Sequence, residues 1–459
     1  MNWDDRVRFQ AGSSSRWASV ALFLLGLGSK TRVFFIGSLS LSEMAVFALA
    51  PIVFLRDYGK LKKDGFMPLI WMVTCLMMAM FVSAKWNHTA FPFVFKSFAV
   101  FYSVLAHIVV FHNLLRKNFN ALWIFWLGFF FSSVITIFGL NPTVQVSDSG
   151  FAYVGQDSVE DVLNGQMFLM GRLKSLLQLP IFGWYLKIPV FYSVLMSVAY
   201  TLVMMLTTIS GRSASLVTLL GALIILIGGK RRPTMRGIGK HLIMYAMLGF
   251  GVVLCYKGAY SYLARNGVLG EGALAKYEGQ TQQGSGLIRM LISGRREFFI
   301  GLGAAIDNPF IGFGPHAYDE KGYVEQFFAK YGLDEGERYY FVVKDMIERQ
   351  GGKMIIPAHS HIIGAWVHYG LFGLLFYVWV AVIIVQHFRR YAAAIPQWYG
   401  YFALTLISFL WDMFFSAFAN RDGFAFMMVC LFFARAVGSG RIALPLKMEL
   451  EACSCDSRR

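Results

Sequence analysis

Two histidines at two-residue spacing, His359 and His361, stand where a polar segment meets a long apolar run in PAHSHIIGAWVHYGLFG, residues 357–373. The positive end of a helix dipole disfavours the imidazolium form, so a histidine at a helix start tends to stay neutral at pH 7. A neutral imidazole can accept a proton from a hydroxyl group, as a general base does. A histidine here also fits a simple anchor in the lipid headgroups, and on these residues both interpretations stay open.

Three arginines next to apolar segments suit an anionic ligand. Arg295 and Arg296 fall in the expected first turn of a helix, where a positive charge is repelled by the helix dipole. A favourable interaction with another group must therefore stabilise an arginine at this position. Arg212 lies between two apolar runs in TTISGRSASL, and charges beside the hydrocarbon region are costly and often functional. The guanidinium fork binds two phosphate oxygens at once. Contact with acidic lipid headgroups, or a snorkelling stop signal, is the competing interpretation.

The stretch that carries Arg295 and Arg296, ISGRREFFIGLGAAIDNPFIGFG at residues 292–314, is patterned as an amphipathic helix closed by an Asn-Pro pair and a glycine turn. We expect this helix to lie on the membrane surface through one apolar face. The predicted face comprises Phe298, Phe299, Leu302, Ala305 and Ile306.

The chain that must position these residues has the composition of a polytopic membrane protein. Of its 459 residues, 57% are hydrophobic and only 15% are charged, and the mean hydropathy is +0.54. Apolar runs of about 20 residues recur, and in lipid only helices and closed barrels satisfy the backbone. We therefore expect an all-α integral membrane bundle. Its candidate spans lie at 17–28, 33–55, 66–84, 91–111, 121–139, 188–209, 213–228, 241–257, 361–386, 398–418 and 423–437.

The net charge of +16 comes from short basic loops, whereas residues 258–358 hold 11 Lys and Arg against 12 Asp and Glu. This positive-inside pattern places the basic loops in the cytoplasm and argues against nucleic acid as a partner. The loops at 114–118 and 229–240 are both placed in the cytoplasm, so an even number of crossings must separate them. The candidate spans supply three, and we therefore expect the short apolar stretch 175–186 to be a further, kinked or re-entrant crossing. The basic loops lie at 56–64, 114–118, 229–240 and 387–391.

The expected layout therefore has about twelve transmembrane helices and both termini in the cytoplasm. It divides into an N-terminal transmembrane bundle at 1–257 with a periplasmic loop near 140–174, a large periplasmic loop with amphipathic helices at 258–358, C-terminal transmembrane helices at 359–440, and a cytoplasmic tail at 441–459.

We expect neither a metal nor another cofactor. The 258–358 segment contains no Asp-x-Asp pair of the kind that holds a diphosphate-binding metal, and its acidic clusters are typical of solvated surface. The five cysteines form no disulfide framework.

Three segments between residues 207 and 373 resemble the O-antigen ligase and polymerase family, membrane glycosyltransferases that act on undecaprenyl-diphosphate-linked glycans. SGRSASL is similar to the family's Ser-Arg-small-small helix start. GRREFF followed by NPFIGFG is similar to its Gly-Arg-x-x-x-aromatic helix and Pro-Phe-x-Gly-x-Gly turn. AHSHIIGAWVHYGLFG is similar to its His-Asn-x-x-Leu segment ending in Gly-x-x-Gly. The three follow the family's order and fall on the same predicted face.

In this register His359 falls on the family's essential histidine, His361 is its neighbour, and the GRREFF spacing selects Arg295 over Arg296. The chain departs from the family pattern at two positions of the histidine segment. They are Ser360, where Asn is common, and His368, where an acid is common.

The resemblance implies an inverting transfer of glycan from undecaprenyl diphosphate to a sugar hydroxyl, at the periplasmic face of a bacterial inner membrane. His359 would be the base, Arg212 and Arg295 would bind the diphosphate, and His361 and Arg296 would support them. The acceptor is lipid A-core for a ligase, which the histidine segment favours, or another lipid-linked glycan for a polymerase. A transporter or flippase for lipid-linked sugars is the alternative from another class; it would place its charges at mid-depth in the helices.

Overall fold

The computed structural model describes residues 14–29, 32–34, 38–117, 122–137, 262–263, 265–266, 296–331, 355–358, 360–391, 409, 413–414, 421–439 and 441–442. This part of the chain is mostly helical, with one short antiparallel hairpin made of β1 (Arg32–Phe34) and β2 (Ser38–Ser40). The helices are α1 (Ser14–Gly28), α2 (Leu41–Asp64), α3 (Met67–Trp86), α4 (Phe91–Lys117), α5 (Leu122–Ile137), α14 (Arg296–Asp307), α15 (Tyr323–Tyr331), α17 (His361–Tyr391) and α19 (Arg421–Gly438).

Within the described residues, three helices are long and apolar enough to cross a membrane, namely Met67–Trp86, Phe91–Arg116 and His361–His387. They coincide with three of the expected spans, so the structure supports a membrane-type helical fold. The total of about twelve spans and the placement of 258–358 outside the cytoplasm stay predictions, because residues 138–261 lie outside the described part.

The apolar run 33–55 is not one helix, and its basic neighbour 56–64 is not a loop. β1 and β2 occupy the first part of the run, and α2 then continues through the basic stretch to Asp64. A capping box sets the helix start: Ser40 Oγ accepts from Glu43 N at 3.1 Å, and the Glu43 carboxylate accepts from Ser40 N at 2.8 Å. This local capping interrupts the run, which hydropathy alone does not detect.

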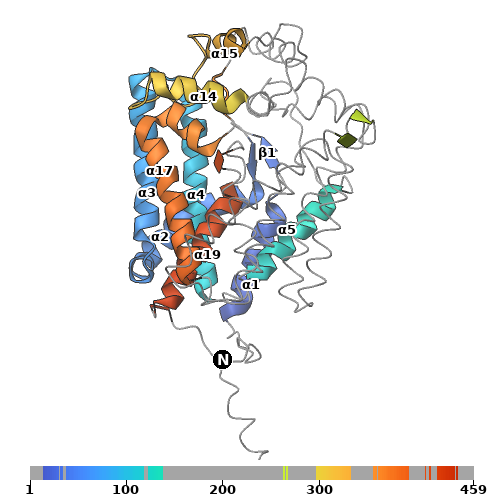
Figure 1. Cartoon of the computed structure of the whole chain (residues 1–459). Coiled ribbons are helices and arrows are strands. Elements are labelled where there is room, and N and C mark those ends of the chain that lie inside the picture. Colours follow the sequence, from blue (N-terminus) through green and yellow to red (C-terminus); the bar gives the residue numbers. More distant parts are fainter. Residues whose placement is uncertain are drawn as a thin grey trace, which may run out of the picture.

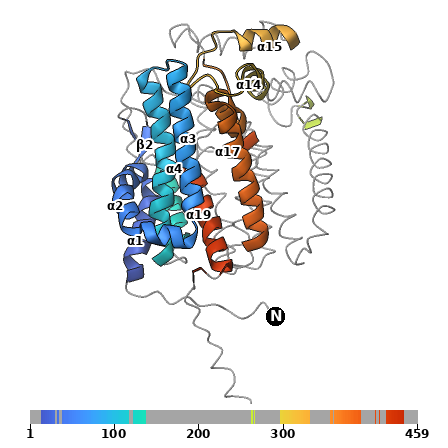
Figure 2. The same ribbon diagram turned by 90° about the vertical axis from the view of Figure 1, so that its left-hand side faces the viewer.

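The helices α3, α4, α17 and α19 stand together as an upright bundle, and α14 lies across one end of it with α15 beyond (Figures 1 and 2). Large apolar side chains fill the space between these helices, and many of them are fully buried. They include Phe66, Leu69, Leu76, Phe111, Phe376, Val380, Val429, Phe432 and Phe433.

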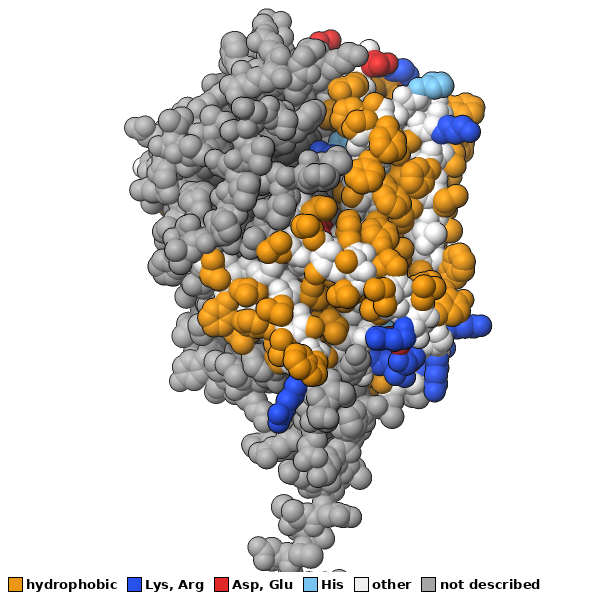
Figure 3. All heavy atoms as spheres, turned by 180° about the vertical axis from the view of Figure 1, so that it is seen from behind, with side chains coloured by type: hydrophobic (Ala, Val, Ile, Leu, Met, Phe, Trp, Pro, Cys, Tyr) orange, Lys and Arg blue, Asp and Glu red, His pale blue; other side chains and the backbone are white. Residues whose placement is uncertain are grey.

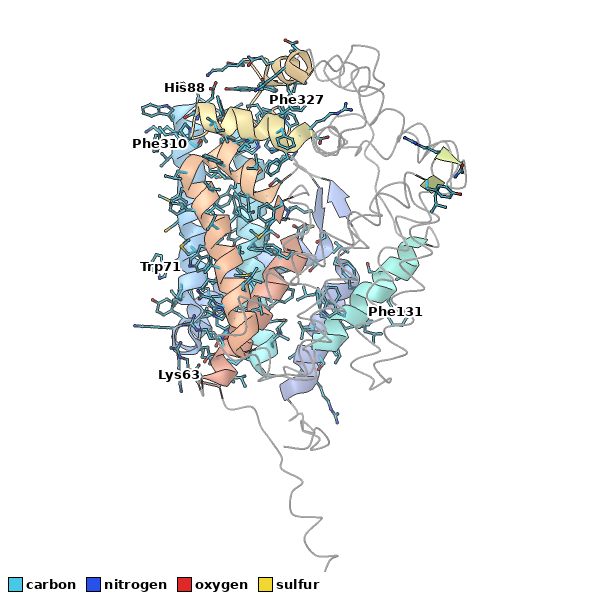
Figure 4. All side chains as sticks on the ribbon, viewed as in Figure 1. Lys63, Trp71, His88, Phe131, Phe310 and Phe327 are labelled. Carbon is cyan, nitrogen blue, oxygen red and sulfur yellow. The ribbon has the colours of Figure 1, made fainter. Side chains whose placement is uncertain are left out.

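The two ends of the bundle differ in charge, and an apolar belt separates them on the face seen in Figure 3. Lys63 lies at one end, while His88 and Phe310 lie at the other, on the side of α14 (Figure 4). Arg56 and Lys60 extend from the same turns of α2 as Lys63, with 58% and 50% of their side chains exposed. We call this the basic end, and the end covered by α14 the capped end.

Buried polar groups tie α2 to α4 at the basic end. Asp64 Oδ2 lies 2.9 Å from His112 Nε2 and accepts from Arg116 Nε at 2.8 Å. Burial alone would raise the pKa of Asp64, but these two partners outweigh it and hold the pKa below its usual 3.8. Asp57 is buried two turns earlier in α2 and accepts from Asn113.

Candidate functional site

The structure describes two of the five predicted site residues, His361 and Arg296. His359, Arg295 and Arg212 lie outside the described residues. In the sequence Arg295 directly precedes α14, His359 lies two residues before α17, and the turn at 308–314 follows α14.

α17 is two helical segments that meet at a corner, Gly370, whose φ of 66° and ψ of −156° are not helical. In a straight helix His361 and Tyr377 would be about 24 Å apart, because each residue adds 1.5 Å. Their ring centroids are 5.8 Å apart instead. Nearer the corner, a Cβ added at Gly373 would lie 2.1 Å from the carbonyl oxygen of Ala365. The first segment, 361–369, therefore folds back against the second, which runs from 371.

This corner corrects the expected position of His361 at the mouth of the span 361–386. The second segment has 21 residues, 371–391, and is long enough to cross a membrane by itself. His361 lies back along it beside Tyr377, about 10 Å from the corner at seven residues of 1.5 Å each. It is 7% exposed and also packs near Phe409, with ring centroids 6.1 Å apart. The histidine therefore lies inside the bundle, where the apolar pattern alone placed it at the surface.

Ser360 fixes the start of the first segment. Its Oγ accepts from Ile363 N at 3.2 Å, as an N-cap does, and donates to Met413 O at 2.8 Å. The side chain is buried, so the cap also anchors this helix start to another part of the chain. Asn is as good an N-cap as Ser, which gives a physical reason why either residue suits this position.

The turn at 308–314 closes the corner by taking over backbone groups that have lost their helical partners. Three backbone bonds do this: Phe313 N to Val367 O at 2.7 Å, Gly314 N to His368 O at 3.1 Å, and Leu371 N to Phe310 O at 3.2 Å. Trp366 Nε1 also donates to Pro309 O at 3.0 Å, and Ser83 Oγ of α3 donates to His368 O at 2.8 Å. The corner is thus a joint between α3, the turn and α17.

Two glycines make this close approach possible. A Cβ at Gly370 would lie 2.0 Å from Phe310 O, and a Cβ at Gly312 would lie 2.6 Å from Gly370 N. Both residues have a positive φ, which L side chains rarely adopt. The glycine-spaced segments NPFIGFG and GLFG are therefore two halves of one interlocking contact.

α14 packs on the first segment of α17 through small residues. A Cβ at Gly301 would lie 3.0 Å from Ile363 Cγ2 and 3.2 Å from Pro357 O. The buried residues of α14 are Arg296, Ile300, Gly301, Ala304 and Ala305.

The apolar residues predicted to share one face of α14 differ in burial, since Ala305 is fully buried and Ile306 is 61% exposed. Phe298, Phe299 and Leu302 are only partly buried, although they do pack against the small cluster around Ile300. Small side chains form the contact because they allow α14 to approach α17 closely. α14 is therefore packed against protein along one side.

Arg296 begins α14 and is 8% exposed, so its charge is directed into the protein. A buried guanidinium requires polar or anionic partners. This burial distinguishes Arg296 from an arginine that only reaches outward to headgroups.

α15 is joined to the far end of α14 by Asp307. Its carboxylate accepts from Tyr323 Oη at 2.7 Å and from Lys321 Nζ at 3.0 Å. These partners lower the pKa of Asp307, while burial and the neighbouring carboxylates raise the pKa of Tyr323. Asp319 caps α15 by accepting from Tyr323 N and Val324 N.

A cluster of basic side chains lies next to the corner and was missed by the sequence analysis. His316 follows the turn, and its ring centroid is 5.5 Å from that of Phe93 on α4. Lys96 is one turn further along α4, and His368 Nδ1 donates to Gly314 O at 2.9 Å. Burial, then the charges of His368 and Lys96, lower the pKa of His316 to about 3. In the sequence, the one indication of this cluster was Lys96, a charged residue inside the apolar run 91–111.

No group of three or more potential metal ligands occurs among the described residues. The fold and the corner together define a membrane-type helical bundle in which a short histidine-bearing segment folds back from a corner at the capped end. A scan against protein-family models and a search of curated proteins find no match for the chain.

Proposed function

We propose that this chain is a membrane glycosyltransferase that moves a glycan from undecaprenyl diphosphate to a sugar hydroxyl, as an O-antigen ligase or, alternatively, as a polymerase. The observation that carries the proposal is the interlocking of NPFIGFG with GLFG, which joins the arginine-bearing helix and the histidine-bearing helix into one unit. A base and a phosphate clamp need such a fixed separation, because proximity and orientation supply much of the rate.

The asymmetry of charge supports an orientation with the site facing the periplasm of a bacterial inner membrane. Arg56, Lys60 and Lys63 gather at the basic end, which the positive-inside rule assigns to the cytoplasm. The capped end, with α14 and α15, then faces outward. Twelve spans and cytoplasmic termini remain part of the proposal.

In the proposed reaction His359 takes the proton from the acceptor hydroxyl. The acceptor oxygen bonds to the anomeric carbon as the bond from that carbon to the diphosphate breaks, which inverts the centre. The electron pair leaves with the diphosphate, whose charge Arg212 and Arg295 neutralise, and Arg296 supports them from the start of α14. His361 packs in an aromatic environment beside Tyr377 and Phe409. The sugar-phosphate bond supplies the driving energy, so no cofactor is required.

The test is transfer by purified full-length protein given lipid-linked donor and acceptor. We expect His359→Ala to abolish transfer and His361→Ala to keep a substantial part of it. His88→Ala is the matched control, since His88 is an exposed histidine of the capped end. Transfer by His359→Ala with none by His361→Ala would assign the base to His361. No transfer by the wild type would favour the transporter alternative.

The clamp has its own test. Arg295→Lys should retain little of the wild-type activity, because the ammonium group is a point charge and lacks the two-pronged geometry of guanidinium. Full activity of Arg295→Lys combined with Arg212→Lys would make both arginines membrane anchors. Activity that EDTA removes and Mg²⁺ restores would contradict a metal-independent mechanism.

Orientation is tested by cysteine labelling in intact cells. A cysteine at Lys330 on α15 should react with a membrane-impermeant thiol reagent, whereas one at Lys62 on α2 should react only after the membrane is opened. The reverse pattern would place the capped end in the cytoplasm, where ligation of a flipped lipid-linked glycan cannot occur.

A further inference from the structure

We propose that the basic end of the bundle, away from α14, carries a binding site for the headgroup of an anionic phospholipid. The site is independent of glycan transfer, so a binding measurement tests it whether or not the chain is a transferase. We call its five basic side chains the basic cluster. They are Arg56, Lys60 and Lys63 of α2, Arg116 near the end of α4, and Arg441, which follows α19.

Three members of the basic cluster form one row along α2. Arg56, Lys60 and Lys63 follow one another at spacings of four and three residues, which places them on the same face of a helix. All three are exposed. Figure 3 shows Lys and Arg side chains gathered beyond the edge of the apolar belt at this end, and Lys63 is labelled there in Figure 4.

Arg116 and Arg441 join this row from two other elements. Asp64, the last residue of α2, accepts from Arg116 Nε at 2.8 Å, while 34% of the Arg116 side chain stays exposed. Gly65 comes next, and a Cβ added there would clash with Nη1 of Arg441, so the guanidinium group lies against this glycine. Arg441 N donates to Ala436 O at 2.8 Å, which fixes the chain after α19. Three separate elements therefore bring their basic groups to one place.

Two buried carboxylates hold the cluster in position without cancelling its charge. Asp57 accepts from Arg56 Nη2 at 3.1 Å and also from Lys60 Nζ, as Asp64 does from Arg116. Both carboxylates are only 1% exposed, so an anion that approaches from outside meets the basic groups and not the acids. Two carboxylates against five basic groups leave a net positive charge. Phosphate oxygens accept from both guanidinium and ammonium groups.

Exposed apolar side chains beside the row favour a lipid as the source of the phosphate. Ile52 is 64% exposed and lies four residues before Arg56, so it continues the same row; Leu55 is 80% exposed and Tyr58 is 44% exposed. A helix with exposed apolar and basic side chains lies where acyl chains meet headgroups, and anionic lipids attract it. A free phosphate would gain nothing from Ile52 and Leu55. The occupant is therefore an anionic phospholipid, with its phosphate at the basic cluster.

Binding is measured by native mass spectrometry of the full-length protein from an uncharged maltoside detergent. The probes are dioctanoyl phosphatidylglycerol, dioctanoyl phosphatidylcholine as a lipid of equal chain length without net charge, and inorganic phosphate as a free anion. We expect phosphatidylglycerol to bind saturably and about tenfold more tightly than phosphatidylcholine, because only the former brings a net negative charge to the cluster.

Substitutions locate the site. Lys63→Gln and Arg441→Gln should each weaken the binding of phosphatidylglycerol about fivefold, since each removes one basic group near the headgroup. Lys63→Arg keeps the charge and should keep the affinity. Lys85→Gln in the last turn of α3 is the matched control, because it removes an exposed charge from the capped end. It should change the affinity by less than about twofold.

Four results would overturn the proposal. Phosphatidylcholine that binds as tightly as phosphatidylglycerol would make the contact purely apolar. Inorganic phosphate that binds as tightly would make the ligand a free anion. An equal loss in Lys85→Gln would reduce the effect to the overall charge of the protein. A dimer that forms without lipid and is lost in Lys63→Gln would assign this surface to a second copy of the chain.

Discussion

Replacement of Gly370 by alanine is the most direct test of the corner in α17. Gly370 has φ 66° and ψ −156°, a region of backbone conformation that is essentially restricted to glycine and costs other residues about 1 to 3 kcal/mol. The new Cβ would also lie 2.0 Å from Phe310 O, so the turn at 308–314 must move away.

Movement of the turn breaks the backbone bonds across the corner. Three such bonds join the turn to α17, and each contributes about 1 kcal/mol net. Together with the backbone strain, we expect Gly370→Ala to lower the free energy of unfolding by roughly 3 to 6 kcal/mol. A loss of this size exceeds the effect of most single substitutions.

The measurement is unfolding of the purified protein in detergent, followed by tryptophan fluorescence. Gly303→Ala in α14 is the matched control, because a Cβ at Gly303 meets nothing within 4 Å and alanine favours a helix interior by about 1 kcal/mol. We expect Gly303→Ala to be neutral or slightly stabilising. Equal stability of Gly370→Ala and the wild type would refute the corner, since a straight helix would tolerate alanine there.

Three further changes test other parts of the molecule. Ser360→Asn should keep the stability and Ser360→Ala should lower it by about 1 kcal/mol, as measured by the same unfolding assay, because Asn can cap the helix and Ala cannot. Asp64→Ala should cost about 3 to 5 kcal/mol in that assay, since it removes the buried carboxylate that bonds both His112 and Arg116. His316 has a folded pKa of about 3 against an ordinary 6.5, so the folded state resists protonation and stability falls as pH drops below 6.5. The loss is about 2 kcal/mol by pH 5, and His316→Gln should remove it from the pH profile of unfolding.

Much of the helical framework was predictable from hydropathy. The spans 66–84 and 91–111 coincide with α3 and α4, since long apolar runs have no other stable form in lipid. The run 33–55 was not predictable in the same way. A capping box at Ser40 and Glu43 starts the helix late, and such a cap depends on side-chain geometry that a window average removes.

The corner at Gly370 was beyond prediction from its own segment. Residues 361–386 read as one continuous apolar helix, and glycine alone costs a helix only about 1 kcal/mol. What bends the chain is the turn at 308–314, which lies more than fifty residues earlier and supplies the missing backbone bonds. A tertiary contact therefore decides where His361 lies, and it moves that residue from the expected surface into the bundle.

The glycines nevertheless carried usable information. A spacing such as Gly-x-x-Gly in an apolar helix, or Gly-x-Gly after Pro-Phe, indicates that another backbone approaches closely, but it does not say which one. Here the two glycine sets contact each other, because Gly312 and Gly370 approach so closely that neither has room for a side chain. This contact is fixed by backbone atoms alone, so it holds α14 and the first segment of α17 at a set distance whatever side chains they carry. Substitution of side chains on either helix should therefore leave the distance between the helices unchanged. The proposed transferase requires such a fixed distance between its base and its diphosphate clamp.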